Sequence, residues 1–100
     1  MRELNTMLEV KQRNRCNGYY FFSPDTMRWF NSRICGELVE HCYFITSEKG
    51  PNNKREYTIR IAYENGKIGS LSQFGEYATL KRAQGALQRF IKSERVMLTL

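Results

Sequence analysis

The stretch REYTIRIAYENGKIGSLSQF, residues 55–74, decides the fold because it is patterned as two β-strands joined by a tight turn. Apolar residues at the odd positions from 57 to 63 alternate with polar or small ones, which is typical of a half-buried strand. Asn65-Gly66 is a strong signal for a two-residue hairpin turn, since both residue types tolerate positive φ. The returning strand, 67–74, is less regular, and Gly69 predicts a bulge there.

An amphipathic helix is predicted directly after the hairpin, in TLKRAQGALQRFIKSE (79–94). Thr79 is a favourable N-cap, and apolar residues recur at positions 83, 86, 87, 90 and 91, which is one face of a helix. Gly85 inside this helix costs about 1 kcal/mol relative to Ala. We therefore expect Gly85 to allow close approach of the sheet or of a partner.

A second helix is predicted before the hairpin, in SPDTMRWFNSRICG (23–36). Ser23 can cap it, and Pro24 suits the first helical position. Gly36 can end a helix in the left-handed conformation. The pattern predicts a helix over 24–35.

Two further strands complete the predicted sheet. HCYFITSEK (41–49) is rich in β-branched and aromatic residues, and YYFF (19–22) is interpreted as a strand or as an extended lead-in that packs on the core. Residues 1–18 form a basic arm or a short helix, 19–95 one domain, and 96–100 a tail that adds an edge strand or frays. The expected fold is an α+β domain with a three- to four-stranded antiparallel sheet packed on one face by two helices, in the order (arm)-β-α-β-β-β-α.

Positive charge is concentrated at the two ends of the chain. The net charge is +6, of which residues 1–18 carry +2 (4 − 2), residues 19–78 carry 0 (7 − 7) and residues 79–100 carry +4 (5 − 1). If the two ends lie side by side, they form one basic face that attracts an anionic partner such as nucleic acid. The alternative is an ordinary basic protein with a solvated charged surface.

The strongest candidates for nucleic-acid contact lie on the last predicted helix. Lys81 and Arg82 fall in its first turn, where cations oppose the helix dipole, and a local rule broken without obvious gain suggests function. Arg89 shares a face with Arg82, and Lys92 lies on a neighbouring stripe. Arg60 is expected to project from the sheet face opposite the core. The alternative is that a helix exposes Lys and Arg to solvent anyway.

A second candidate contact surface lies in the earlier predicted helix. Trp29 falls off its apolar stripe and is flanked by Arg28 and Arg33. These three residues are either part of a partner-binding surface or solvated parts of the fold, and the sequence does not decide between the two.

No pattern for catalysis, metal binding or membrane insertion is recognised. Cys35, His41 and Cys42 lack the paired short spacings of structural zinc sites, and Cys16 is distant from them. No segment reaches the roughly 20 apolar residues of a membrane helix. We expect no enzyme activity, no cofactor, no metal and no membrane association, and free thiols in a reducing cytoplasm.

Three stretches together resemble a family of short proteins from bacteriophages and mobile elements. They are FFSPDTMRWFNSR (21–33), YFITSE (43–48) and REYTIRIAYENGKIGSLSQFGEYATLKRAQGAL (55–87), which are similar to the family's FFSxDTMRFFxSR, YFVTSE, YTVR and YAT motifs. The resemblance spans roughly residues 20–92. It implies a setting in the host bacterial cytoplasm and transfers no catalytic residues.

Three functions follow from these observations. The first is a small binding protein that contacts nucleic acid or a nucleoprotein through its basic terminal segments. The second is an inhibitor of a host defence system, of the anti-CRISPR type, that binds a host protein surface. The third is a dimeric structural module joined through the sheet edge or the tail. Both a monomer and a homodimer are compatible with the sequence.

Overall fold

The chain forms helices on both sides of one antiparallel sheet. The computed structural model describes residues 4–29, 31–50 and 52–98, with side chains up to residue 93. The elements are α1 (Met7–Cys16), α2 (Pro24–Trp29), β1 (Arg33–Val39), β2 (Tyr43–Lys49), β3 (Arg55–Ala62), β4 (Ile68–Ser70) and α3 (Leu80–Leu98). This arrangement confirms the predicted α+β class and antiparallel sheet, which has four strands.

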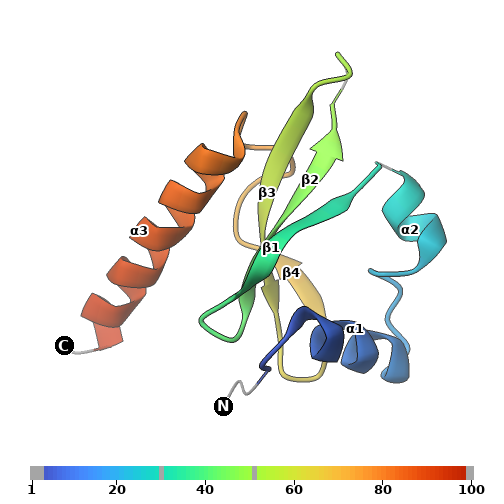
Figure 1. Cartoon of the computed structure of the whole chain (residues 1–100). Coiled ribbons are helices and arrows are strands. Elements are labelled where there is room, and N and C mark those ends of the chain that lie inside the picture. The colour runs from blue at the N-terminus through green and yellow to red at the C-terminus, as the bar shows by residue number, and fades with distance from the viewer. Residues whose placement is uncertain (1–3, 30, 51, 99–100) are drawn as a thin grey trace.

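The sheet is a simple meander in which each strand pairs with the next one along the chain (Figure 1). Its longest ladder joins β2 and β3, from Tyr43 opposite Ile61 to Lys49 opposite Arg55. The pairing of β1 is interrupted after Cys35, where Gly36 has a φ of 80°. The two central strands therefore supply most of the residues that carry the core.

One face of the sheet packs against α3. Side chains at odd positions of β2 and β3 form a core with the apolar stripe of α3, and the buried members are Tyr43, Ile45, Ile59, Ile61, Ala83, Leu87 and Ile91, with Cys42. The stripe predicted for the last helix is confirmed at Ala83, Leu87 and Ile91, whereas Phe90 is exposed and only its ring edge meets Tyr43.

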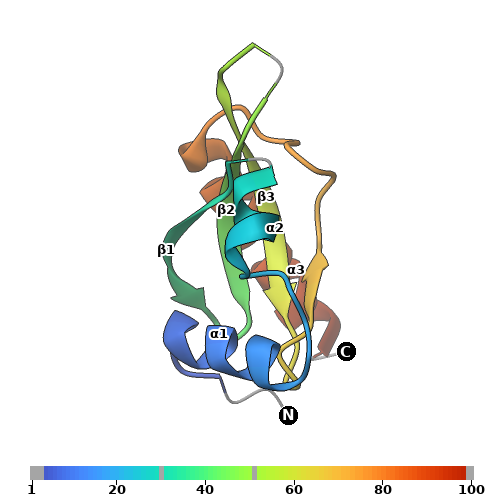
Figure 2. The ribbon, with the colours of Figure 1, turned by 90° about the vertical axis from the view of Figure 1, so that its right-hand side faces the viewer.

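The other face of the sheet packs against the N-terminal part of the chain, so the expectation of one covered face is wrong. Figures 1 and 2 show α3 on one side of the sheet and α1 with α2 on the other. The second core consists of Leu4, Met7, Val10, Phe44 and Ala62, with Phe21 and Phe22 against it. The physical reason is that β2 is buried on both faces: Phe44 is an apolar residue at an even position, and Thr46 and Glu48 beyond it are buried as well.

Residues 7–16 form a helix rather than a flexible arm. The Thr6 hydroxyl caps it by accepting the backbone N–H of Glu9 at 3.2 Å. The buried residues Met7, Val10 and Asn14 recur at helical spacing. Because this buried face meets Phe44 and Ala62, which point away from α3, the two basic ends of the chain do not form one face.

The helix predicted over 24–35 begins as expected and ends early. The Ser23 hydroxyl accepts the N–H of Thr26 at 3.3 Å, and Pro24 is the first helical residue. The helix ends at Trp29, because Asn31 takes the left-handed conformation with a φ of 51°. The amides of Asn31 and Ser32 bond back to the carbonyls of Arg28 (3.0 Å) and Met27 (2.7 Å), which is a Schellman ending built on Asn.

Residues 19–22 form no strand, so the first strand of the predicted order is absent. Ser23 N–H bonds to the Tyr20 carbonyl at 3.1 Å in a turn. The rings of Phe21 and Phe22 lie 6.2 and 6.1 Å from the ring of Phe44. Residues 19–22 therefore form a lead-in whose aromatic rings pack on the core, which is the second of the two interpretations that the sequence allowed.

The β3–β4 turn lies at Asn65-Gly66, but it is a three-residue loop with Gly66 alone at positive φ (89°). Its ends close through the Gly66 N–H to Tyr63 and the Tyr63 N–H to Lys67, both at 2.8 Å. β4, Ile68–Ser70, is shorter than the predicted strand 67–74, mainly because it ends at Ser70.

Helix α1 lies directly against this turn. The Asn14 amide donates to the Gly66 carbonyl at 2.7 Å, Arg13 to Glu64 at 3.0 Å, and Asn17 to Asn65 at 2.6 Å. A side chain at position 66 would collide with the backbone of Arg13 and Asn14. Glycine is therefore required there both for its conformation and for the close approach of α1.

Helix α3 continues through residues 96–98, which were expected to add an edge strand or to fray. No Gly or Pro follows Gly85 in the chain, so nothing in the sequence ends the helix there. Residues 99–100 lie outside the part that the structure describes.

Candidate nucleic-acid interface

The start of α3 fixes the direction of its charged side chains. The Thr79 hydroxyl accepts the N–H of Arg82 at 3.1 Å, and its carbonyl accepts the N–H of Ala83 at 3.1 Å, as the predicted N-cap requires. Ala83 and Leu87 are buried against the sheet. The opposite side of the helix is therefore held toward solvent.

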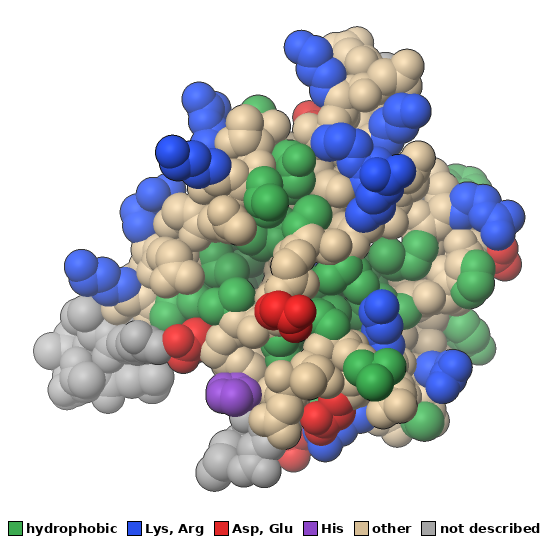
Figure 3. All heavy atoms as spheres, viewed as in Figure 1, with side chains coloured by type: hydrophobic (Ala, Val, Ile, Leu, Met, Phe, Trp, Pro, Cys, Tyr) green, Lys and Arg blue, Asp and Glu red, His purple; other side chains and the backbone are tan. Residues whose placement is uncertain are grey.

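Four predicted contact residues lie together on that exposed surface. Lys81, Arg82, Arg89 and Lys92 are all exposed. Figure 3 shows Lys and Arg side chains in a row along the outer edge of α3. The grouping that the sequence predicted for the last helix is thus present in the structure.

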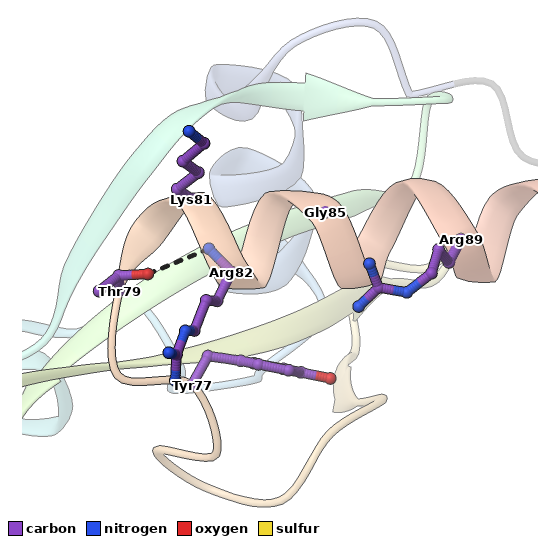
Figure 4. A pocket seen from close by; sticks show the side chains of 6 residues that line it. All are labelled: Tyr77, Thr79, Lys81, Arg82, Gly85 and Arg89. Atoms are coloured by element: carbon purple, nitrogen blue, oxygen red, sulfur yellow. Dashed lines mark hydrogen bonds between the residues drawn. The ribbon is translucent and has the colours of Figure 1, made fainter.

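An open pocket of about 550 Å³ lies between the first half of α3 and the segment that leads into it. Its lining residues are Tyr77, Thr79, Lys81, Arg82, Gly85 and Arg89. In Figure 4 the Arg82 and Arg89 side chains lie on either side of Gly85 with the Tyr77 ring below them, while Lys81 points away from that ring. The pocket is therefore cationic at both ends and has an aromatic ring at its base.

The loop after β4 holds Tyr77 in this position. The backbones of Tyr77 and Tyr57 pair through two hydrogen bonds of 2.8 and 3.1 Å. Earlier in the loop, Leu71 N–H bonds to Ile59, and Gly75 N–H bonds to the Thr58 hydroxyl at 2.8 Å. Tyr77 also packs against the core under α3, so its ring is anchored before any ligand arrives.

The Tyr77 phenol is held in its neutral form. Burial raises its pKa, and the neighbouring Glu76 carboxylate raises the pKa further because it disfavours a second negative charge. The positive charge of Arg89 lowers the pKa of Tyr77, so the Arg89 guanidinium lies within electrostatic reach of the phenol. The phenol is thus a hydrogen-bonding, stackable group and adds no charge to the pocket.

Sequence reasoning missed Tyr77 as a site residue. Its ring reaches the pocket only because the loop after β4 pairs with Tyr57, twenty residues earlier, a contact that no local pattern predicts. The available signal was the aromatic position two residues before the Thr79 cap.

Arg60 does not belong to this surface. It lies on the sheet face opposite α3, and its side chain is only 13% exposed. It donates to the Thr46 hydroxyl at 3.0 Å and to the Ser70 hydroxyl at 2.7 Å, and lies 3.5 Å from the buried Glu48 carboxylate. Burial lowers the pKa of the Arg60 guanidinium, and the charge of Glu48 opposes that change. Its contacts are those of an internal ion pair.

The remaining predicted residues lie apart from the α3 surface. Arg28 and Trp29 are on α2, which covers the other side of the sheet, and Trp29 is 80% exposed. Arg33 is exposed at the start of β1. The structure therefore divides the eight predicted contact residues between the two sides of the sheet.

The cysteines and the histidine form no metal centre within the described part of the chain. Cys16, Cys35 and Cys42 are free thiols, and no three His, Cys, Asp or Glu side chains gather there as a ligand set. The His41 ring donates through Nδ1 to the Leu4 carbonyl at 2.9 Å, which is a structural contact. None of the described helices is both long and apolar enough to cross a bilayer.

Comparison with known proteins identifies a family but no activity. The model of a family of unknown function, DUF7447, matches residues 6–88. That range covers α1, the whole sheet and the start of α3, including Tyr77 and Arg82. No curated protein and no solved structure matches the chain.

Proposed function

The chain belongs to the DUF7447 family, and we propose that it binds nucleic acid through the phosphate backbone, using the exposed cations of α3. Lys81 and Lys92 are eleven residues apart, which is about 16 Å along a helix. A nucleic-acid strand presents roughly one phosphate per 3.4 Å of duplex axis. The cation row is therefore long enough to face several phosphates of one strand.

One observation carries this proposal: the cations Lys81, Arg82, Arg89 and Lys92 lie together on α3 with no carboxylate partner among the described side chains. None of Lys81, Arg82, Arg89 and Lys92 forms an ion pair with a carboxylate among the side chains described up to residue 93. Arg13 and Arg60 do pair, with Glu9 at 2.8 Å and with Glu48. Exposed cations outside α3, such as Lys11 and Arg15, resemble those of α3 in lacking a described carboxylate partner, but they do not line the pocket. Unpaired cations gathered on one helix favour an anionic partner.

The helix starts support the same interpretation. α1 and α2 carry Glu9 and Asp25 in their first turns, where an acid stabilises the helix dipole. α3 has no acid there, and instead carries Lys81 and Arg82, which oppose the dipole at a cost of a few tenths of a kcal/mol. Phosphate binding would explain why Lys81 and Arg82 occur in the first turn despite this unfavourable interaction with the helix dipole.

The setting is part of the proposal and is supported by the sequence resemblance alone. We place the protein in a host bacterial cytoplasm, as a non-enzymatic accessory to the nucleic acid, or a nucleoprotein, of a phage or mobile element. Backbone contacts of this kind provide affinity with little sequence preference.

Fluorescence anisotropy with labelled DNA and RNA oligonucleotides, single-stranded and duplex, tests the proposal at about 50 to 200 mM salt. The triple variant Lys81→Ala, Arg82→Ala and Arg89→Ala should weaken binding at least about tenfold at 50 mM salt. It should also lower the slope of log K against log salt by about 2, since each phosphate contact contributes roughly 0.7 to 0.9.

The control is a triple variant of equal charge away from α3, with Lys11→Ala and Arg15→Ala on α1 and Lys67→Ala beside the β3–β4 turn, all of which are exposed. It should bind within about twofold of the parent protein, since general charge effects at this salt are small. Absence of binding to every oligonucleotide at 50 mM salt overturns the proposal. Equal loss in both triple variants also overturns it.

A further inference from the structure

We infer that the pocket between Tyr77 and α3 receives one unstacked nucleotide, so that the protein prefers single-stranded nucleic acid to a duplex. The inference rests on the proposed function and names its substrate class. A duplex keeps its bases stacked inside and presents a continuous convex backbone, whereas a single strand can turn a base outward into a recess.

The size and charge of the pocket suit a nucleotide. Its volume of about 550 Å³ lies in the range of small-molecule sites, roughly 300 to 1,000 Å³. Arg82 and Arg89 are seven residues apart, which is about 10 Å along the helix. They can therefore hold the phosphates on either side of a nucleotide whose base enters between them (Figure 4).

The Tyr77 ring is the stacking surface in this arrangement. It lies at the base of the pocket, fixed by its backbone pairing with Tyr57 and by the core beneath it. Base stacking on an aromatic ring is tolerant of sequence, because every base has a π-face.

Gly85 keeps the pocket open. It lines the pocket between the two arginines, where any other residue would place a side chain. A Cβ at this position would lie 3.5 Å from Arg89 Nη1, which is ordinary contact without a clash. Alanine would thus fit at position 85 without a clash and would favour the helix more than glycine does. The space that glycine leaves in the pocket explains why glycine occurs there instead.

The first test uses Gly85→Ala, which is expected to stabilise the fold because alanine is the better helix former. We expect a higher midpoint of urea unfolding together with severalfold weaker binding of a single-stranded 12-mer. The matched control is Gln88→Ala, an exposed position on the same helix, which should leave binding within about twofold. Higher stability with unchanged single-strand binding overturns the inference.

The second test removes the ring. Tyr77→Leu should weaken single-strand binding about five- to hundredfold, as loss of a stacked aromatic residue does elsewhere, and should leave duplex binding unchanged. Tyr77→Phe keeps the ring and should bind within about twofold. Circular dichroism verifies that each variant is folded. If Tyr77→Leu does not fold, the single-strand binding of Gly85→Ala and Tyr77→Phe still tests the inference.

Comparing single-stranded and duplex DNA and RNA of one sequence separates the two proposals. Tighter binding of single strands by at least about tenfold supports the inference. Equal or tighter binding of the duplex overturns the inference and leaves the proposed function standing. Binding of neither form overturns both.

Discussion

Arg60 on one face of the sheet and the arginines of α3 on the other have opposite surroundings. On the face covered by α1 and α2, Arg60 is buried with Glu48 and lies 5.3 Å from the Phe21 ring and 6.0 Å from the Phe74 ring. On the α3 side, Arg82 and Arg89 are exposed and lack a carboxylate partner among the described side chains. The residue type is the same, and the surroundings differ in every respect.

The difference teaches how to separate structural from functional charge in a small basic protein. Net charge alone counts Arg60 and Arg82 equally, although the charge of Arg60 is balanced inside the fold by Glu48. Only cations without an internal partner contribute to the attraction of an anionic ligand. The predictions below test this division, beginning with the largest effect.

Arg60→Ala should destabilise the fold strongly. Because Glu48 is 1% exposed, its carboxylate would be left buried without a counter-charge, which costs about 3–5 kcal/mol. Urea unfolding measures the loss, and nucleic-acid affinity below the unfolding transition should stay unchanged. The combined variant Glu48→Leu with Arg60→Met should lose less than Arg60→Ala alone. Intact stability with reduced binding would show that Arg60 belongs to the interface after all.

The two threonine caps offer a smaller and better matched comparison. Thr79→Ala and Thr6→Ala each remove one hydroxyl that accepts a helix N–H, and each should cost about 1 kcal/mol in urea unfolding. Thr79→Ala should in addition weaken nucleic-acid binding, because its loss frees the turn that positions Arg82. If Thr6→Ala weakens binding as much, the α3 side has no special role.

The smallest effect is expected from Lys81→Glu. An acid in the first turn of α3 should stabilise the protein by about 0.3–1 kcal/mol through the helix dipole. The same change places a negative charge in the cation row, so binding should weaken as stability rises. Thermal unfolding and anisotropy on one protein sample check both changes. A parallel fall in stability and affinity would contradict the assignment of Lys81 to binding.

Local patterns predicted those parts of the fold that depend on neighbours in the chain. The Ser23 and Thr79 caps and the buried stripe of Ala83, Leu87 and Ile91 are such features, and the structure confirms them. The end of α2 escaped prediction because the left-handed residue that ends the helix is Asn31, whereas Gly36 was expected to end it. Gly36 also has a positive φ, but it lies inside β1. The sequence therefore predicted the conformation of Gly36 correctly and its position in the fold wrongly.

Features that depend on strand register could not be predicted from the sequence. Arg60 faces Phe44 across the β2–β3 ladder and reaches Thr46 and Glu48, which lie two and four residues further along the partner strand. Without the register, Arg60 was indistinguishable from a solvent-exposed cation. The candidate site was predicted in its cations, which share one helix, and missed in Tyr77, which arrives from the preceding loop.

The attachment of α1 to the β3–β4 turn has a consequence for synthesis on the ribosome. The three side-chain bonds that fasten α1 join residues 48 to 52 positions apart. At roughly 5–20 residues per second, the partner residues emerge about 3–10 seconds after α1 does. During that interval Met7 and Val10 have no sheet to cover them. Among the described helices, α1 therefore stays uncovered longest, and nascent chains halted before residue 66 should present it to proteases.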